Sequence, residues 1–267
     1  PLLKTQLPEI VDMDMPVEGV FHNCVIVSID KRYPMQSRRL MSALWGLGQM
    51  SFVKTIVTVD ADVNVHDYEE VARILLSTVD FETDLFFSEG ILDVLNHASD
   101  QMLYGSKLGI DLTNKIEGEP GYGKEDPPHA HPPALPKQEA VIEAFPEVKA
   151  VAEIQNSILL VALDKTAPNQ GKQFIQSFFD HPKFSTVEIV IVLEGHVDLT
   201  NISIVMWKFL NNIDPKRDFH FEGERLGIDA TKKFPEEGYQ QNWPEEIEMT
   251  AEIKTKVDNK WDNLFKG

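Results

Sequence analysis

The chain repeats itself, and this duplication constrains its fold more than any other feature. At least ten positions carry the same residue at a constant offset of 134, among them Val27/Val161, Asp30/Asp164, Lys31/Lys165, Pro34/Pro168, Gln36/Gln170, Val53/Val187, Val63/Val197, Val71/Val205, Asp80/Asp214 and Asp84/Asp218. Chance does not give ten matches at one offset. We therefore predict two copies of one folding unit of about 130 residues each.

A second offset shows where the two copies differ in length. The tetrapeptide Leu-Gly-Ile-Asp at 108–111 recurs at 226–229, an offset of 118 instead of 134, so the second copy is 16 residues shorter. The extra residues of the first copy fall within 90–107. This segment follows a predicted strand, where binding residues are often found.

Each copy alternates apolar β-rich segments with helical stripes. The expected strands of the first copy are 23–29, 55–59, 84–88 and 108–112, and the expected helices are 34–50 and 67–79. The second copy repeats this order and includes an apolar helix over 201–213. The fold class is therefore α/β, with two tandem repeats of a βαβ-type layered domain. Each repeat has a largely parallel sheet with helices packed on it.

Composition shifts divide the chain into three parts. We predict a first repeat over 1–117 with a long loop at 90–107, a proline-rich linker over 118–138, and a second repeat over 139–267 that lacks the loop and ends in a helix. Because the chain opens on Pro1 and not on Met, we expect it to be a fragment, either a C-terminal piece of a larger protein or a trimmed chain.

Charge and cysteine content exclude several classes. The 43 acidic and 25 basic residues leave a formal charge of −18, which disfavours nucleic acid and anionic membrane surfaces as partners. Cys24 stands alone, so no intramolecular disulfide forms and we expect a cytoplasmic protein. It lies in a predicted buried strand and is expected to be a core residue. No apolar run is long enough for an integral membrane segment.

Familiar catalytic motifs are absent, and two weaker groups of residues favour structural roles. His129 and His131 lie in the linker without a third metal ligand, so we expect them to be solvated. The oxygen-bearing residues 60, 62 and 64 follow a strand and could hold Mg²⁺ or Ca²⁺. The second copy carries Glu194, His196 and Asp198 there, so the ligand chemistry is not repeated and strand-end capping is favoured.

The extra segment of the first copy is the best functional signal. It combines the apolar residues Ile91, Leu92 and Leu95 with His97 and Lys107. One interpretation is that it lines a substrate pocket that only one copy needs. The alternative is a solvated excursion in which His97 forms loop hydrogen bonds.

Several stretches resemble the C-terminal domain of the UbiD-type decarboxylases. The matching stretches are 7–12, 16–19, 57–64, 105–115 and the tail over 243–264. The resemblance implies a carboxy-lyase that removes CO₂ from aromatic or α,β-unsaturated carboxylic acids, in some relatives within ubiquinone or menaquinone biosynthesis. It also implies an N-terminal flavin domain that binds prenylated FMN with Mn²⁺ and K⁺.

The same resemblance limits what this chain does. Catalytic residues, cofactor-binding residues and metal ligands are expected upstream of Pro1, so none is assigned here and the chain alone is expected to bind no cofactor and to be inactive. Ile91, Leu92, Leu95 and His97 become candidate lining residues near the substrate, and Lys107 a candidate loop anchor. We expect a homo-oligomer whose second copy takes the place of a partner's domain.

Two other classes stay open. One is a stand-alone scaffold or oligomerisation module without catalysis. The other is a small-molecule-binding α/β protein that uses the strand-end carboxylates Asp60 and Asp62.

Overall fold

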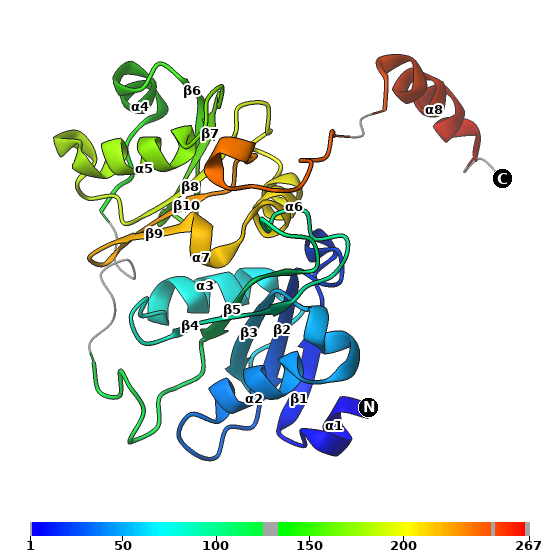
Figure 1. Ribbon diagram of the computed structural model, residues 1–267, viewed down its shortest axis with the longest axis vertical. Coiled ribbons are helices and arrows are strands. Elements are labelled where there is room, and N and C mark those ends of the chain that lie inside the picture. The colour runs from blue at the N-terminus through cyan, green and yellow to red at the C-terminus, as the bar shows by residue number, and fades with distance from the viewer. Residues whose placement is uncertain (1, 125–132, 247–248, 265–267) are drawn as a thin grey trace.

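A computed structural model describes residues 2–124, 133–246 and 249–264 of the chain. It forms two α/β units that pack against each other, one in the lower and one in the upper half of Figure 1. The two residues His129 and His131 lie outside the described part.

The first unit contains one five-stranded sheet in the order β1-β2-β3-β5-β4. Its strands are β1 (Ile10–Asp14), β2 (Cys24–Ile29), β3 (Thr55–Asp60), β4 (Leu85–Ile91) and β5 (Tyr104–Asp111). Its helices are α1 (Leu2–Gln6), α2 (Gln36–Trp45) and α3 (Tyr68–Thr78), with 3₁₀ turns η1 (Val17–Gly19) and η2 (Gly48–Phe52).

The second unit repeats this order as β6-β7-β8-β10-β9. Its strands are β6 (Val148–Ile154), β7 (Ile158–Leu163), β8 (Ile189–Glu194), β9 (Phe219–Glu222) and β10 (Arg225–Asp229). Its helices are α4 (Gln138–Ala144), α5 (Gln170–Asp180), α6 (Ile202–Asn212) and α7 (Pro215–Asp218), with 3₁₀ turns η4 (Pro182–Phe184) and η5 (Pro235–Glu237). The predicted duplicated α/β fold is confirmed.

The sheets are parallel only at their centres. In the first unit, β2 pairs in parallel with β3 and β3 with β5, while β1 and β4 join as antiparallel edges. The second unit has the same pattern. The prediction of a largely parallel sheet therefore holds for the three central strands of each unit and not for the two edge strands.

Helices on both faces of the sheet explain why the central strand β2 is buried along its whole length. All six residues of β2 are buried. Val25 and Val27 pack with α2, whereas Cys24 and Ile26 pack in the cluster around α3, because successive side chains point to opposite faces. Burial also raises the pKa of the Cys24 thiol to about 12, so the prediction of a core cysteine is confirmed.

The predicted loop at 90–107 is largely a β-hairpin. Strand β4 runs to Ile91 and β5 begins at Tyr104, with Gly90 opposite Gly105 in the ladder. Only residues 92–103, called the hairpin tip below, lie between them. The corresponding connection in the second unit is the two-residue turn at 223–224. The 16-residue difference thus lengthens one hairpin, and Ile91 and Lys107 lie in strands and not in a loop.

Two further boundaries differ from expectation. The helix expected over 34–50 ends at Trp45, and Gly48 then takes a left-handed φ of 47° before the 3₁₀ turn η2. Glu119, which we assigned to the linker, is buried and forms part of the first unit. Figure 1 shows the C-terminal helix α8 (Ala251–Leu264) beyond the second unit, apart from both sheets.

Candidate functional site

The two repeats meet across an interface with approximate two-fold symmetry. Phe87 and Phe221 occupy equivalent positions at the offset of 134, and their ring centroids lie 6.2 Å apart across the interface. Helices α3 and α6 are equivalent as well, and Leu210 of α6 packs in the cluster that contains Val71 of α3. Contact between a residue and its own equivalent is the mark of a two-fold interface.

The β4–β5 hairpin reaches across this interface, and the second repeat fixes both its tip and the start of β5. Asp214 accepts hydrogen bonds from both the backbone N–H and the hydroxyl of Ser106. Arg217 Nη1 lies 2.6 Å from Asp100 Oδ1, and the Gln241 amide donates to the carbonyl of Ser99 at 2.7 Å. These contacts order a segment that a simple surface loop would leave free.

Lys54 lies beneath the hairpin tip and is fully buried. Its Nζ donates to Asn96 Oδ1 at 3.1 Å and to the carbonyl of Ile213, at the end of α6, at 2.9 Å. Burial lowers its pKa to about 7, although Asp214 opposes this shift. The second copy carries Glu188 at the equivalent position. Lys54 therefore supports the hairpin tip that only the first repeat carries, and no sequence motif marks it.

His97 faces the second repeat and not solvent. Its Nε2 lies 3.1 Å from Asn212 Oδ1, its ring meets Trp243 edge-on at 4.9 Å, and its carbonyl accepts from the Tyr239 hydroxyl. Burial lowers the pKa of His97 to about 4, so the ring is neutral near pH 7. These contacts give His97 a role in docking the hairpin tip.

Lys107 sits at the base of the hairpin and holds the backbone. Its Nζ donates to the carbonyls of Ser51 and Val53, each at 2.8 Å, and burial lowers its pKa to about 8. Arg225 stands at the equivalent position of the second copy and donates to Val187 O at 3.0 Å. Val187 is the equivalent of Val53, so both repeats use a cation at this place for the same contact.

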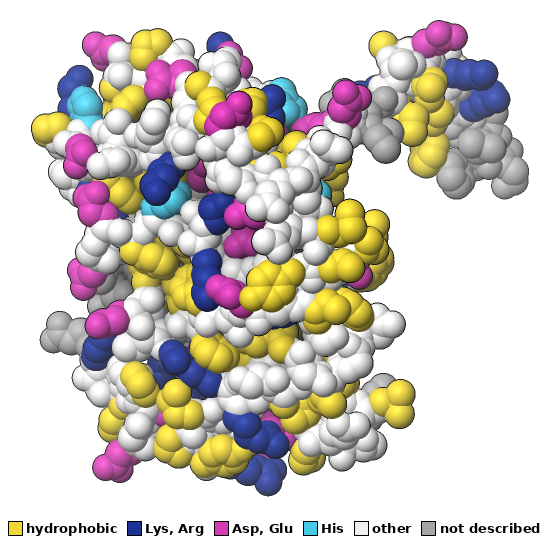
Figure 2. Space-filling model, viewed as in Figure 1, with side chains coloured by type: hydrophobic (Ala, Val, Ile, Leu, Met, Phe, Trp, Pro, Cys, Tyr) yellow, Lys and Arg dark blue, Asp and Glu magenta, His cyan; other side chains and the backbone are white. Residues whose placement is uncertain are grey.

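The outward side of the hairpin is apolar. Among the predicted residues Leu92 is fully buried, whereas Ile91 and Leu95 are exposed by 46% and 66%. Further exposed apolar residues of this segment are Val94, Met102, Leu103 and Tyr104. Figure 2 shows hydrophobic side chains gathered on the right of the body, where Figure 1 draws the hairpin tip. The hairpin therefore presents several exposed apolar side chains from one short segment.

A second, purely internal polar constellation is duplicated at the carboxyl edge of each sheet. In the first repeat Lys31 Nζ lies 2.5 Å from Glu119 Oε2, and both side chains are almost fully buried. In the second, Lys165 Nζ lies 2.8 Å from Glu237 Oε1. The lysines match at the offset of 134 and the glutamates at 118. Extending the second offset beyond 229 would have revealed Glu119 in the sequence.

A lysine between two aspartates completes each copy, partly buried in the first repeat and fully buried in the second. Lys115 Nζ lies 2.6 Å from Asp84 and 3.8 Å from Asp111. Its equivalent Lys233 lies 3.3 Å from Asp218 and 3.2 Å from Asp229. The carboxyl edge of a parallel sheet is a common ligand site, but here these charges neutralise one another.

These pairings bear on the flavin cofactor implied by the resemblance. A flavin phosphate needs cationic or backbone donors that are free to reach it. Lys31, Lys115, Lys165 and Lys233 are all engaged by carboxylates of their own repeat. The described residues at these edges therefore do not fit the cofactor.

The strand-end acids of the alternative small-molecule hypothesis serve local structure at least in part. Asp60 Oδ2 accepts the backbone N–H of Asn114 at 2.9 Å, and burial raises the pKa of this carboxyl. In the second repeat, ligand atoms of Glu194, His196 and Glu246 lie within 4.8 Å of one another and could hold a metal ion. Lys208 already donates to Glu246, so a cation would compete with its ammonium group.

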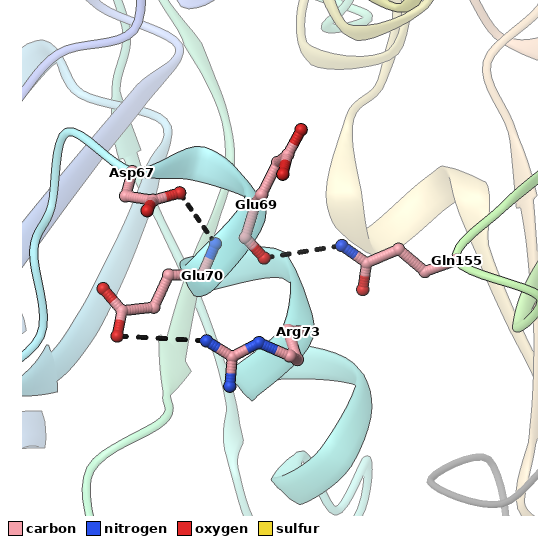
Figure 3. A pocket seen from close by; sticks show the side chains of 5 residues that line it. All are labelled: Asp67, Glu69, Glu70, Arg73 and Gln155. Carbon is pink, nitrogen blue, oxygen red and sulfur yellow. Dashed lines mark hydrogen bonds and ion pairs between the residues drawn. The ribbon is translucent and has the colours of Figure 1, made fainter.

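A polar hollow opens at one end of the repeat interface. It has a volume of about 340 Å³ and is lined by Asp67, Glu69, Glu70, Arg73 and Gln155. Figure 3 shows Gln155 reaching from the second repeat to the first turn of α3, where its Nε2 lies 3.4 Å from the carbonyl of Glu69. Its lining includes acidic side chains and one arginine, and none of the five lining residues is fully buried.

Comparison with known proteins defines the class. The profile of the 3-octaprenyl-4-hydroxybenzoate carboxy-lyase C-terminal domain, UbiD_C, matches residues 1–112 and 132–236. The chain therefore belongs to the UbiD family. Its two repeats are two copies of the C-terminal domain of that family, as the sequence resemblance predicted.

Similar proteins differ in how much of the chain they match. An uncharacterised Helicobacter pylori protein is 31% identical over 265 residues, which cover 95% of this chain and 40% of that protein. An Archaeoglobus fulgidus protein is 46% identical over 128 residues, covering 48% of this chain and 26% of that protein. The chain thus spans less than half the length of these relatives.

Solved structures of UbiD-class enzymes are also similar. The vanillic acid decarboxylase of Sedimentibacter hydroxybenzoicus, in open form, is 22% identical with a TM-score of 0.43, over 53% of this chain and 29% of that one. HmfF of Pelotomaculum thermopropionicum, in complex with FMN, is 23% identical with a TM-score of 0.40, over 46% of this chain and 27% of that one.

Among the helices that the structure describes, none has the length and apolar character needed to span a membrane.

Proposed function

We propose that this chain is the C-terminal region of a decarboxylase that removes CO₂ from an aromatic or α,β-unsaturated carboxylic acid. The family membership supports the reaction class. Prenylated FMN, with Mn²⁺ and K⁺, would be held by the remainder of the longer protein and would serve as the electron sink. The chain by itself binds no cofactor and is inactive in this proposal.

The observation that carries the role of this region is the hairpin tip. Its inner side is fixed to the second repeat through Lys54 and His97, while Leu95 and its apolar neighbours point outward. A rigid segment with an apolar outer side suits the ring or chain of an apolar acid. In this proposal Ile91 and Leu95 approach the substrate, and Leu92, His97 and Lys107 hold them in place.

The experiment uses the full-length protein, loaded with prenylated FMN and Mn²⁺, and measures CO₂ release from a panel of aromatic and unsaturated acids. Leu95→Asp should lower kcat/KM at least tenfold by placing a charge against an apolar substrate. Tyr122→Asp is a matched control, because Tyr122 is 56% exposed and lies outside the hairpin. Absence of CO₂ release from every acid would contradict the proposed reaction.

The family resemblance also supports a wider proposal about context. We place the protein in the cytoplasm as a homo-oligomer, in a pathway such as quinone biosynthesis. The single buried Cys24 suits a reducing compartment. The second repeat occupies a place that a partner's domain would take, which agrees with the two-fold contact of Phe87 with Phe221.

A further inference from the structure

The two-fold relation between the repeats makes the two ends of their interface comparable. At one end the turn before β7 contacts the first turn of α3, through Gln155 and Glu69. At the other end the loop before β2 contacts the first turn of α6, where Ser203 Oγ donates to Glu18 Oε1 at 2.7 Å. Ser203 is the equivalent of Glu69 at the offset of 134. The same elements therefore meet at both ends.

The two ends have opposite chemistry. The polar hollow occupies one end, and three of its residues have apolar equivalents at the other. These pairs are Glu70/Ile204, Arg73/Trp207 and Gln155/Phe21. The three apolar side chains are exposed, Phe21 by 67%. Because the polar end folds and packs without them, the fold itself does not require apolar residues here.

The loop that carries Phe21 is also strained. Val20 and Phe21 have left-handed φ values of 50° and 64°, which is costly for a β-branched residue. The equivalent turn at 155–156 is left-handed as well, but it is a tight hairpin turn, where this conformation is required. Asn211 Nδ2 donates to the carbonyl of Glu18 at 2.8 Å and helps to hold the strained loop on α6.

This end of the interface continues into the hairpin tip. His22, next to Phe21, has its Nδ1 4.0 Å from Asp93 Oδ1 in the tip. We call Val17, Phe21, Ile204 and Trp207 the apolar ridge; all four are exposed. Ridge and hairpin tip are thus neighbouring sets of exposed apolar side chains, and the ridge is built from both repeats.

We propose that the apolar ridge is a docking surface for the catalytic part of the full-length protein, outside these 267 residues. The inference rests on the proposed function, in which the adjoining hairpin tip approaches the substrate. The chain covers only 40% of the Helicobacter pylori relative, so a long covalently linked segment is available at high effective concentration.

The test places the photo-crosslinking residue benzoylphenylalanine at position 21 or 207 of the full-length protein, with position 155 as the symmetry-related control. Irradiation should link 21 and 207 to peptides outside the 267 residues, within one chain, as read by mass spectrometry. Position 155 should give no such link. Links to a second copy or to other proteins, or the absence of links to the catalytic part, would overturn the proposal.

A pair of variants supplies the functional arm. Phe21→Asp should lower kcat/KM of the full-length enzyme about tenfold, while Gln155→Asp leaves it unchanged, and neither should shift the melting temperature by more than about 2 °C. An unchanged kcat/KM for Phe21→Asp would overturn the docking. Crosslinks without any CO₂ release would defeat the proposed reaction alone, whereas CO₂ release without crosslinks would defeat the docking alone.

Discussion

The β4–β5 hairpin of the first repeat and the β9–β10 hairpin of the second differ more than any other equivalent pair. The second closes in the two-residue turn 223–224, and the first carries the tip over 92–103. Both sheets have the same order and both keep the buried Lys–Glu pair. The short hairpin shows that the domain folds without the tip. The strand order of the domain therefore does not depend on the tip.

The largest expected effect tests what the repeats share. Glu119→Ala leaves Lys31 buried without its partner and should lower the free energy of unfolding by about 3–5 kcal/mol. Glu237→Ala should cost a similar amount, because Lys165 is equally buried. Urea unfolding at pH 7 measures both, with the exposed Glu117→Ala as control. A loss of less than about 1 kcal/mol in the free energy of unfolding for either variant would show that the two Lys–Glu pairs are not equivalent.

The next effect concerns the tip alone. A Cβ at Gly105 would collide with Ser99 Oγ and Asp214 Oδ2, where the hairpin meets the second repeat. Gly105→Ala should cost about 2–3 kcal/mol by thermal or urea unfolding. Gly90→Ala, on the opposite strand, is the control, since its nearest neighbour is the flexible Lys107 Cε at 3.3 Å. Equal costs would show that the contact with Asp214 is not specific.

Lys54 should make the free energy of unfolding depend on pH above about 7. The second repeat has Glu188 at the equivalent position and therefore no lysine that could titrate there. Its folded pKa of about 7 lies below the ordinary 10.5, so the unfolded chain binds more protons between these values. Stability attributable to Lys54 therefore rises with pH from about 7, by up to roughly 1.4 kcal/mol per pH unit. Lys54→Met should remove this rise in urea unfolding series between pH 7 and 9. If the free energy of unfolding rises equally with pH in the wild-type chain and in Lys54→Met, the lowered pKa of Lys54 is refuted.

The smallest effect is expected on the outer side of the tip. Leu95→Asp should change the stability of this chain by less than about 0.5 kcal/mol, because Leu95 is 66% exposed. Differential scanning fluorimetry is sufficient to measure it. A large loss of stability would mean that Leu95 supports the fold, and its effect on catalysis would then have a structural cause.

The sequence alone predicted the duplication and the central strands because identical residues and apolar periodicity are local signals. It placed Cys24 in the core for the same reason. It did not reveal Lys54 or the docking of His97, since these depend on which face of one repeat meets the other. Position 54 carries Lys in the first repeat and Glu188 in the second, so the duplication does not single it out.

The hairpin illustrates the same limit. The difference between the offsets of 134 and 118 located the extra 16 residues. The apolar residues Ile91 and Leu92 then suggested a loop that lines a pocket. Leu92 is fully buried and His97 contacts the second repeat, because the tip folds back onto Asn212 and Trp243. Such contacts are tertiary, and no periodicity in the sequence encodes them.

Hydrogen exchange tests the central claim most directly, that the hairpin tip and its neighbouring loop face the catalytic part of the protein. Exchange of backbone amides is compared between this chain alone and the same residues in the full-length protein. We predict slower exchange in the full-length protein at 92–95, 101–103 and 17–22, and no change at 223–224. Equal exchange at the tip in both proteins would contradict the account.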